Sequence, residues 1–180
     1  MKNVIILHGA GETPNSFWIP YAKKELEKKG YEVWIPQLPD TDNPVLDKWL
    51  PPVLNQGKFS EETIIISHSA GGPLALSVLE NISVKIKKAI LIAGYSAPLP
   101  EGANDILQNN YDWQKIKENV KDIIFINSDN DPWACDDKQG KKMLDNLGGT
   151  LIIRHGEGHM GSDKFNQPYR EFPFLLRLID

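Results

Sequence analysis

The sequence feature that most constrains the fold is an apolar run followed by mostly small residues. Ile64–Ile66 are three consecutive β-branched residues. Such a run, without polar alternation, is typical of a parallel strand covered on both faces. Small residues then predominate from Ser67 to Gly72, and the run Leu74–Leu79 suits a helix. The pattern predicts a sharp turn from strand into helix with Ser69 at its apex.

A serine at such a turn, called a nucleophile elbow, is exposed and held for attack on a carbonyl. The following helix directs backbone N–H groups at an anion forming near Ser69 Oγ, and the amide of Ala70 is best placed to donate. The usual elbow pattern is Gly-x-Ser-x-Gly, and Ser67 stands where the first glycine is expected. We therefore expect an elbow whose packing departs from the usual pattern at Ser67.

Length and charge narrow the class of protein. A chain of 180 residues is expected to form one domain, over residues 1–180. Its net charge of −4 and the lack of a dense basic block argue against nucleic acid as a partner. Neither a membrane span nor a signal-peptide core is present, which predicts a cytoplasmic protein without a membrane partner. The single cysteine, Cys135, is interpreted as structural.

A second glycine-rich turn follows the first apolar run, Val4–Leu7. Gly9 and Gly11 match the first two glycines of a dinucleotide fingerprint. Pro14 stands at the third position, however, and no acid follows the next strand to hold a ribose. The turn is therefore interpreted as a source of backbone N–H groups for an oxyanion, with Ala10 as first choice and Gly11 as second.

Apolar runs along the chain predict six strands with helices between them. The predicted strands are Val4–Leu7, Tyr31–Ile35, Ile64–Ile66, Lys88–Ala93, Ile123–Ile126 and Leu151–Ile153. The predicted helices are one capped by Asn15 or Ser16 and ending at Lys29, a pair within 46–54 with a break or kink at Pro51 and Pro52, Leu74–Leu79, Asp112–Asn119, Asp136–Leu147 and Phe172–Ile179. The alternation predicts an α/β, doubly wound parallel sheet in the order 2-1-3-4-5-6, flanked by helices.

The longest stretch without periodicity is Gly94–Asn110. Long loops at the carboxyl edge of a parallel sheet tend to cover sites, so a small lid and a plain surface loop are both open interpretations. Tyr95 in this loop, with Trp18 and Trp133, is a candidate for the wall of a substrate pocket.

A serine nucleophile needs a base and an orienting carboxylate, which follow in the order Ser, acid, His on this architecture. The acid is Asp129 or Asp131 after the fifth strand, and the base is His155 or His159 after the sixth. Turn chemistry favours Asp131 over Asp129. His159 is favoured over His155 because its loop is flanked by glycines.

The two remaining histidines, His8 and His68, are interpreted as structural. No histidine pair has the spacing of a zinc motif, so we expect neither a metal nor a cofactor.

The chain resembles the small serine hydrolases of the α/β-hydrolase fold that are typified by retinoblastoma-binding protein nine. The resemblance extends over nearly the whole length, and it is carried by His8, Gly9, Trp18, Lys23–Leu26, Trp49–Pro51, Thr63–Ser69, Trp113–Lys117, Asp131, Pro132, Gly158 and His159. It implies a minimal α/β-hydrolase without a large cap domain. The family's nucleophile, acid and base positions match Ser69, Asp131 and His159.

We therefore expect a serine hydrolase that cleaves a small carboxylic ester or an amide. The alternative is a binding protein that keeps the fold without useful activity and acts through a protein partner. A nucleotide-binding domain that uses Gly9 and Gly11 is a third, weaker interpretation.

Overall fold

The computed structural model describes residues 2–179, and its six strands form one parallel sheet in the order β2-β1-β3-β4-β5-β6. The strands are β1 (Asn3–Leu7), β2 (Glu32–Trp34), β3 (Thr63–His68), β4 (Ile86–Ile92), β5 (Val120–Ser128) and β6 (Thr150–Arg154). All neighbouring strands pair in parallel. The predicted strand order and fold class are confirmed.

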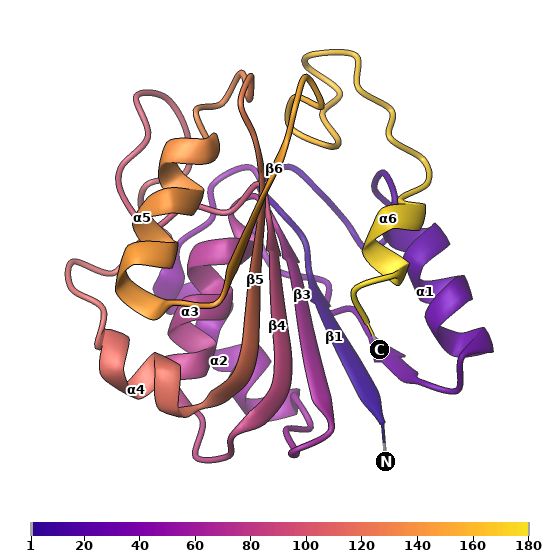
Figure 1. The fold of residues 1–180 in the computed structure, drawn as a ribbon, viewed down its shortest axis with the longest axis vertical. Coiled ribbons are helices and arrows are strands. Elements are labelled where there is room, and N and C mark those ends of the chain that lie inside the picture. The colour runs from indigo at the N-terminus through magenta and orange to yellow at the C-terminus, as the bar shows by residue number, and fades with distance from the viewer. Residues whose placement is uncertain (1, 180) are drawn as a thin grey trace.

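Helices cover both faces of the sheet, as parallel neighbours require of their crossover connections. They are α1 (Ile19–Lys28), α2 (Leu46–Gln56), α3 (Gly71–Asn81), α4 (Trp113–Glu118), α5 (Asp137–Leu147) and α6 (Pro173–Leu176). Figure 1 shows α1 and α6 on one face and the other four helices on the opposite face. Within residues 2–179 no large cap domain is inserted above the sheet.

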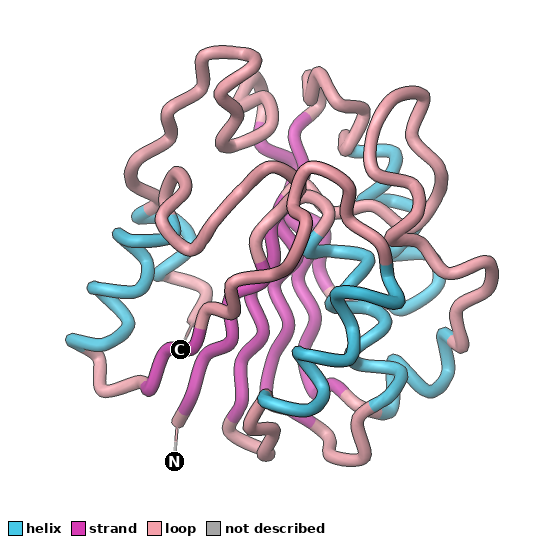
Figure 2. Tube along the Cα trace, turned by 180° about the vertical axis from the view of Figure 1, so that it is seen from behind, coloured by secondary structure: helices cyan, strands magenta, loops and turns pink. Residues whose placement is uncertain are grey.

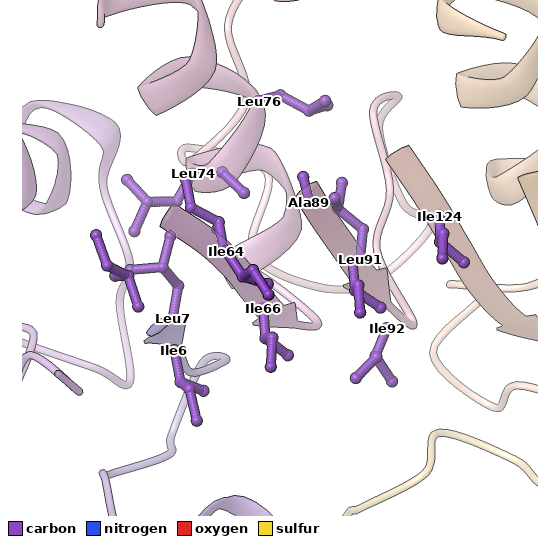
Figure 3. Close-up of a cluster of buried hydrophobic side chains, with 14 of the residues drawn as sticks. Ile6, Leu7, Ile64, Ile66, Leu74, Leu76, Ala89, Leu91, Ile92 and Ile124 are labelled. Atoms are coloured by element: carbon purple, nitrogen blue, oxygen red, sulfur yellow. The ribbon is translucent and has the colours of Figure 1, made fainter. Parts of the chain in front are cut away.

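The core consists of central strands that are apolar on both faces. Ile64–Ile66 of β3 have no exposed surface, as expected for a strand between two helical layers. Figure 3 shows Ile64 and Ile66 clustered with residues of β1, β4, β5 and α3. Fully burying one such side chain contributes about 1.5–3 kcal/mol, so this cluster holds the sheet edge that carries the site rigidly.

The prediction of two helices separated by a break at Pro51 and Pro52 is wrong, because both prolines lie inside one continuous helix, α2. A proline removes the helical hydrogen bond to the carbonyl four residues earlier. Those carbonyls belong to Asp47 and Lys48, which are exposed and so open to water. The buried face of α2, which includes Trp49, keeps the helix in place.

Two helix ends also differ from the prediction. α1 begins at Ile19 with Trp18 as its N-cap, because the hydroxyl of Ser16 accepts a hydrogen bond from the amide of Thr13 in the preceding turn. The final helix is only Pro173–Leu176, shorter than the predicted span.

The loops that follow the strands gather at one end of the sheet (Figure 2). Parallel strands all point the same way, so the residues after β1, β3, β5 and β6 meet at this carboxyl edge. No helix in the described part of the chain has the length and apolar character needed to cross a bilayer.

Candidate active site

Ser69 lies at the apex of the turn between β3 and α3, with a φ of 51°. A non-glycine residue adopts this left-handed region only when its surroundings hold it there. The amide of Ser69 donates to the carbonyl of Ile92, which anchors the turn to β4. A Cβ at Gly71 would collide with the carbonyl oxygen of Leu7, so the turn requires glycine there. The local geometry is that of a nucleophile elbow.

Ser67, which replaces the usual first glycine of the elbow, is completely buried. Its hydroxyl oxygen has no hydrogen-bond partner among residues 2–179. A buried hydroxyl without a partner costs about 1–3 kcal/mol. The elbow therefore has room for the Ser67 side chain, but the Ser67 hydroxyl contributes no hydrogen bond that would stabilise the turn.

The turn after β1 leaves one of its central amides without a protein acceptor. The Gly9 amide donates to Oε2 of Glu12 at 2.8 Å, and the Gly11 amide donates to the carbonyl of Thr41 at 2.7 Å. The Gly11 amide, the second choice for an oxyanion donor, is thus already engaged. The Ala10 amide, the first choice, pairs with no acceptor in the described residues.

Asp131 and His159 form a buried pair. Nδ1 of His159 lies 2.8 Å from Oδ2 of Asp131, and the side chains are 5% and 0% exposed. The second carboxylate oxygen of Asp131 accepts from the amide of Trp133 at 2.8 Å. The amide of His159 donates to the side chain of Gln167. Both groups of the pair are therefore held from two directions, and Nε2 of His159 stays available.

The other two candidates, Asp129 and His155, form a separate pair at the surface. Their contact is 2.5 Å, but the side chain of His155 is 94% exposed. The amide of Gly156 and the contact with His155 lower the pKa of Asp129, and the same carboxylate raises the pKa of His155. The structure does not bring this pair to Ser69.

A pocket of about 300 Å³ opens at the carboxyl edge of the sheet. Ser69 and His159 both line it. Tyr95 and Trp133 also lie on its wall, as expected for a substrate pocket. Trp18 does not: it is completely buried and packs edge-on against His68, and Phe17 lines the pocket in its place.

The 94–110 segment forms part of the pocket wall. Tyr95, Leu99 and Ala103 face the pocket. The hydroxyl of Tyr95 donates to the carbonyl of Ala103, and burial raises the pKa of Tyr95. The side chain of Gln139 accepts from the amides of Ser96 and Ala97. The segment is thus tied down at several points rather than lying loosely over the site.

The sequence analysis missed Glu12, which lines the pocket and forms a buried pair with His68. Oε1 of Glu12 lies 2.6 Å from Nδ1 of His68, and Nε2 of His68 lies 2.9 Å from the carbonyl oxygen of His159. The side chains are 6% and 0% exposed. An acid three positions after Gly9 was the one available signal, and it matches no common motif.

The pKa shifts of this pair reflect its mutual attraction. Burial alone would raise the pKa of Glu12, but the charge and hydrogen bond of His68 outweigh burial and lower it. Burial would likewise lower the pKa of His68, but the charge and hydrogen bond of Glu12 raise it. Burial lowers the pKa of His8, whose ring instead contacts backbone atoms.

One group of potential metal ligands exists in residues 2–179. Atoms of Asp131, Cys135 and His159 lie within 4.8 Å of one another. Burial raises the pKa of the Cys135 thiol, which disfavours the thiolate that binds metals. Asp131 and His159 also already satisfy each other. The chemistry of this set suits a hydrogen-bonded acid and base better than a metal centre.

Comparison with known proteins decides the family. Residues 4–177 match the sequence model of the family described as serine hydrolase. The chain belongs to this family. Within it, this serine hydrolase is 32% identical over 172 residues to the protein YdeN of Bacillus subtilis (strain 168), covering 91% of this chain and 88% of YdeN.

A mammalian member supports the same placement. The serine hydrolase RBBP9 of Rattus norvegicus is 28% identical over 173 residues, covering 94% of this chain and 91% of RBBP9. The crystal structure of the ydeN gene product from B. subtilis superposes with a TM-score of 0.89 at 25% identity, covering 99% of this chain and 97% of that chain. The resemblance to RBBP9-like small serine hydrolases is confirmed.

Proposed function

We propose that this serine hydrolase cleaves a small carboxylic ester through a Ser69–His159–Asp131 triad and an acyl-enzyme. One observation carries the proposal. Ser69 lines the same pocket as His159, whose Nδ1 is committed to the buried carboxylate of Asp131. A histidine whose Nδ1–H donates to a carboxylate presents Nε2 as a base, which is the protonation state that a serine nucleophile requires.

The first step transfers a proton and forms a bond. Ser69 Oγ attacks the substrate carbonyl while Nε2 of His159 takes the hydroxyl proton. Asp131 stabilises the imidazolium that results. Collapse of the tetrahedral intermediate expels the alcohol, which receives that proton from His159. Water then attacks the carbonyl of the acyl-enzyme while Nε2 of His159 takes a proton from it. The second tetrahedral intermediate expels the Ser69 oxygen, which receives that proton, and the acid is released.

The negative charge on the carbonyl oxygen needs donors that are preorganised for it. The amides of Ala10 and Ala70 are the proposed pair, because Ala10 has no protein acceptor and Ala70 is the N-cap of α3. The partial positive charge at the N-terminus of α3 adds to the effect of these amides. Because the amides are already in position, they need not move as the negative charge develops. Gly11 takes no part, since its amide is bound to Thr41.

The pocket restricts the substrate. Its volume of about 300 Å³ lies at the small end of ligand sites, and its wall combines Phe17, Tyr95, Leu99 and Trp133. We infer short or aromatic acyl groups as the preferred class. A panel of p-nitrophenyl esters and aryl amides, assayed with wild type and S69A, tests the proposal. Hydrolysis of a short ester by wild type and not by S69A is expected, whereas equal rates would favour a non-catalytic binding protein.

A further inference from the structure

We propose that Glu12 and His68 form a buried positioning pair that ties the oxyanion turn to the loop that carries the catalytic base. The inference rests on the proposed function, because it assigns these residues a role in the same reaction. Neither residue belongs to the triad. Both act through other groups, and the geometry of their contacts carries the argument.

The pair connects the turn after β1 to the loop after β6. Oε2 of Glu12 accepts from the amide of Gly9, next to the proposed oxyanion donor Ala10. Oε1 of the same carboxylate lies 2.6 Å from His68 Nδ1. His68 Nε2 lies 2.9 Å from the carbonyl oxygen of His159. A continuous chain of hydrogen bonds therefore runs from the oxyanion turn to the base.

The partners on either side fix the protonation of His68. The carbonyl of His159 can only accept, so Nε2 of His68 carries a proton. The carboxylate of Glu12 already accepts from the Gly9 amide, which suits its ionised form, so Nδ1 of His68 also carries a proton. His68 is thus an imidazolium whose two N–H groups donate in opposite directions, an arrangement that fixes the ring plane.

The position of His68 in the sequence places its side chain between the nucleophile elbow and the loop that carries His159. His68 is the last residue of β3 and directly precedes Ser69. Its ring centroid lies 4.9 Å from that of His159, and Phe17 and Trp18 pack edge-on against it. Other ionisable groups near the ring are His8 and Asp131. One side chain thus links the elbow, the oxyanion turn and the base loop.

Two substitutions of Glu12 separate the effect of its hydrogen bonds from the effect of its charge. In E12Q the amide oxygen can accept from Gly9 and the amide nitrogen can donate to a neutral His68, so every hydrogen bond of the chain survives. In E12A the chain is cut. We expect E12A to lower kcat about 100-fold with KM changed less than threefold, because displaced donors weaken only the transition state. E12Q should keep kcat within tenfold of wild type.

The matched control is E32Q, which removes the same charge from an exposed pair between Glu32 and Lys58. It should leave kcat and KM unchanged. A folded E12A with kcat within threefold of wild type would overturn the proposal, as would a loss in E12Q equal to that in E12A. If E12A does not fold, the double variant E12Q/H68N leaves no unpaired charge, still cuts the bridge, and should show the same loss of kcat.

A measurement without turnover keeps this inference separate from the proposed function. In ¹⁵N-histidine-labelled S69A at pH 7, long-range ¹H–¹⁵N spectra should show His68 protonated on both ring nitrogens, and E12Q/S69A should show it neutral. A neutral His68 in S69A would overturn the ion pair. If wild type and S69A hydrolyse an ester at equal rates, the proposed function fails, and these spectra still decide the state of the pair.

Discussion

The carboxylate of Asp131 lies 2.8 Å from Nδ1 of His159 in the pocket wall, while Asp129, two residues earlier, pairs with the exposed His155. The same two loops therefore carry one buried aspartate–histidine pair, whose histidine lines the same pocket as Ser69, and one pair whose histidine is exposed to solvent. Each pair is a natural control for the other.

Replacing Asp131 by Asn should lower kcat by about 10⁴, because the Asn amide would donate to Nδ1 of His159 and force the proton onto Nε2. In that tautomer His159 cannot accept the proton of Ser69. D129N should keep kcat within threefold. Steady-state kinetics with p-nitrophenyl acetate measures both. Equal losses in the two variants would contradict the assignment of the orienting acid.

The stability of the Glu12–His68 pair should depend on pH in a definite direction. The pKa of His68 is raised, so its contribution is full below the usual histidine pKa of about 6.5 and is lost as pH rises through the folded value. The pKa of Glu12 is lowered, so its contribution is present above about 4.3 and is lost as pH falls through the folded value. The pair therefore stabilises most between these limits.

Urea unfolding of wild type and E12Q tests this window, since other titrating groups largely cancel in the difference. The free energy of unfolding of wild type minus that of E12Q should be largest between about pH 4.5 and 6.5 and should shrink from pH 6.5 to 9. A difference that stays constant from pH 6.5 to 9 would show that His68 is neutral in the folded protein.

Ser67→Ala should stabilise the protein. The hydroxyl of Ser67 is buried without a partner among the described residues, so its removal relieves a desolvation cost and leaves a small side chain in place. We expect a gain of about 1 kcal/mol in the free energy of unfolding, with kcat within threefold of wild type. A loss of more than about 1 kcal/mol would mean that the hydroxyl is satisfied.

Gln139→Ala should loosen the 94–110 segment at its start, because Gln139 accepts from the amides of Ser96 and Ala97. Hydrogen exchange of these two amides should accelerate at least tenfold, and stability should fall by about 1–3 kcal/mol. Gln114→Ala, which removes an exposed contact with Glu118, is the control and should change neither. Unchanged exchange in Q139A would show that other contacts hold the segment.

Sequence patterns predicted the sheet well because buried parallel strands leave a strong local signal. Runs such as Ile64–Ile66 mark strands, and right-handed crossovers then fix their order. The elbow was equally visible, since only small residues allow so tight a turn around Ser69.

Features that depend on tertiary contacts were not predictable in the same way. The helix through Pro51 and Pro52 survives because the residues whose carbonyls lose a helical partner are exposed and Trp49 is buried, which no local propensity expresses. Glu12 matters through a contact with His68, 56 positions away, and an isolated acid in a glycine-rich turn carries no signal of that contact. Trp18 is buried against His68 and does not line the pocket, and this too depends on packing between distant segments.

The most direct test of the central claim is intact-mass analysis of the protein after treatment with a fluorophosphonate probe, followed by peptide mapping. Wild type should gain the mass of one phosphonyl group, on the peptide that contains Ser69, and D131N should label at least 100-fold more slowly because the base is no longer oriented. S69A should gain none. Absence of labelling in wild type, or labelling of S69A at the wild-type rate, would contradict the account.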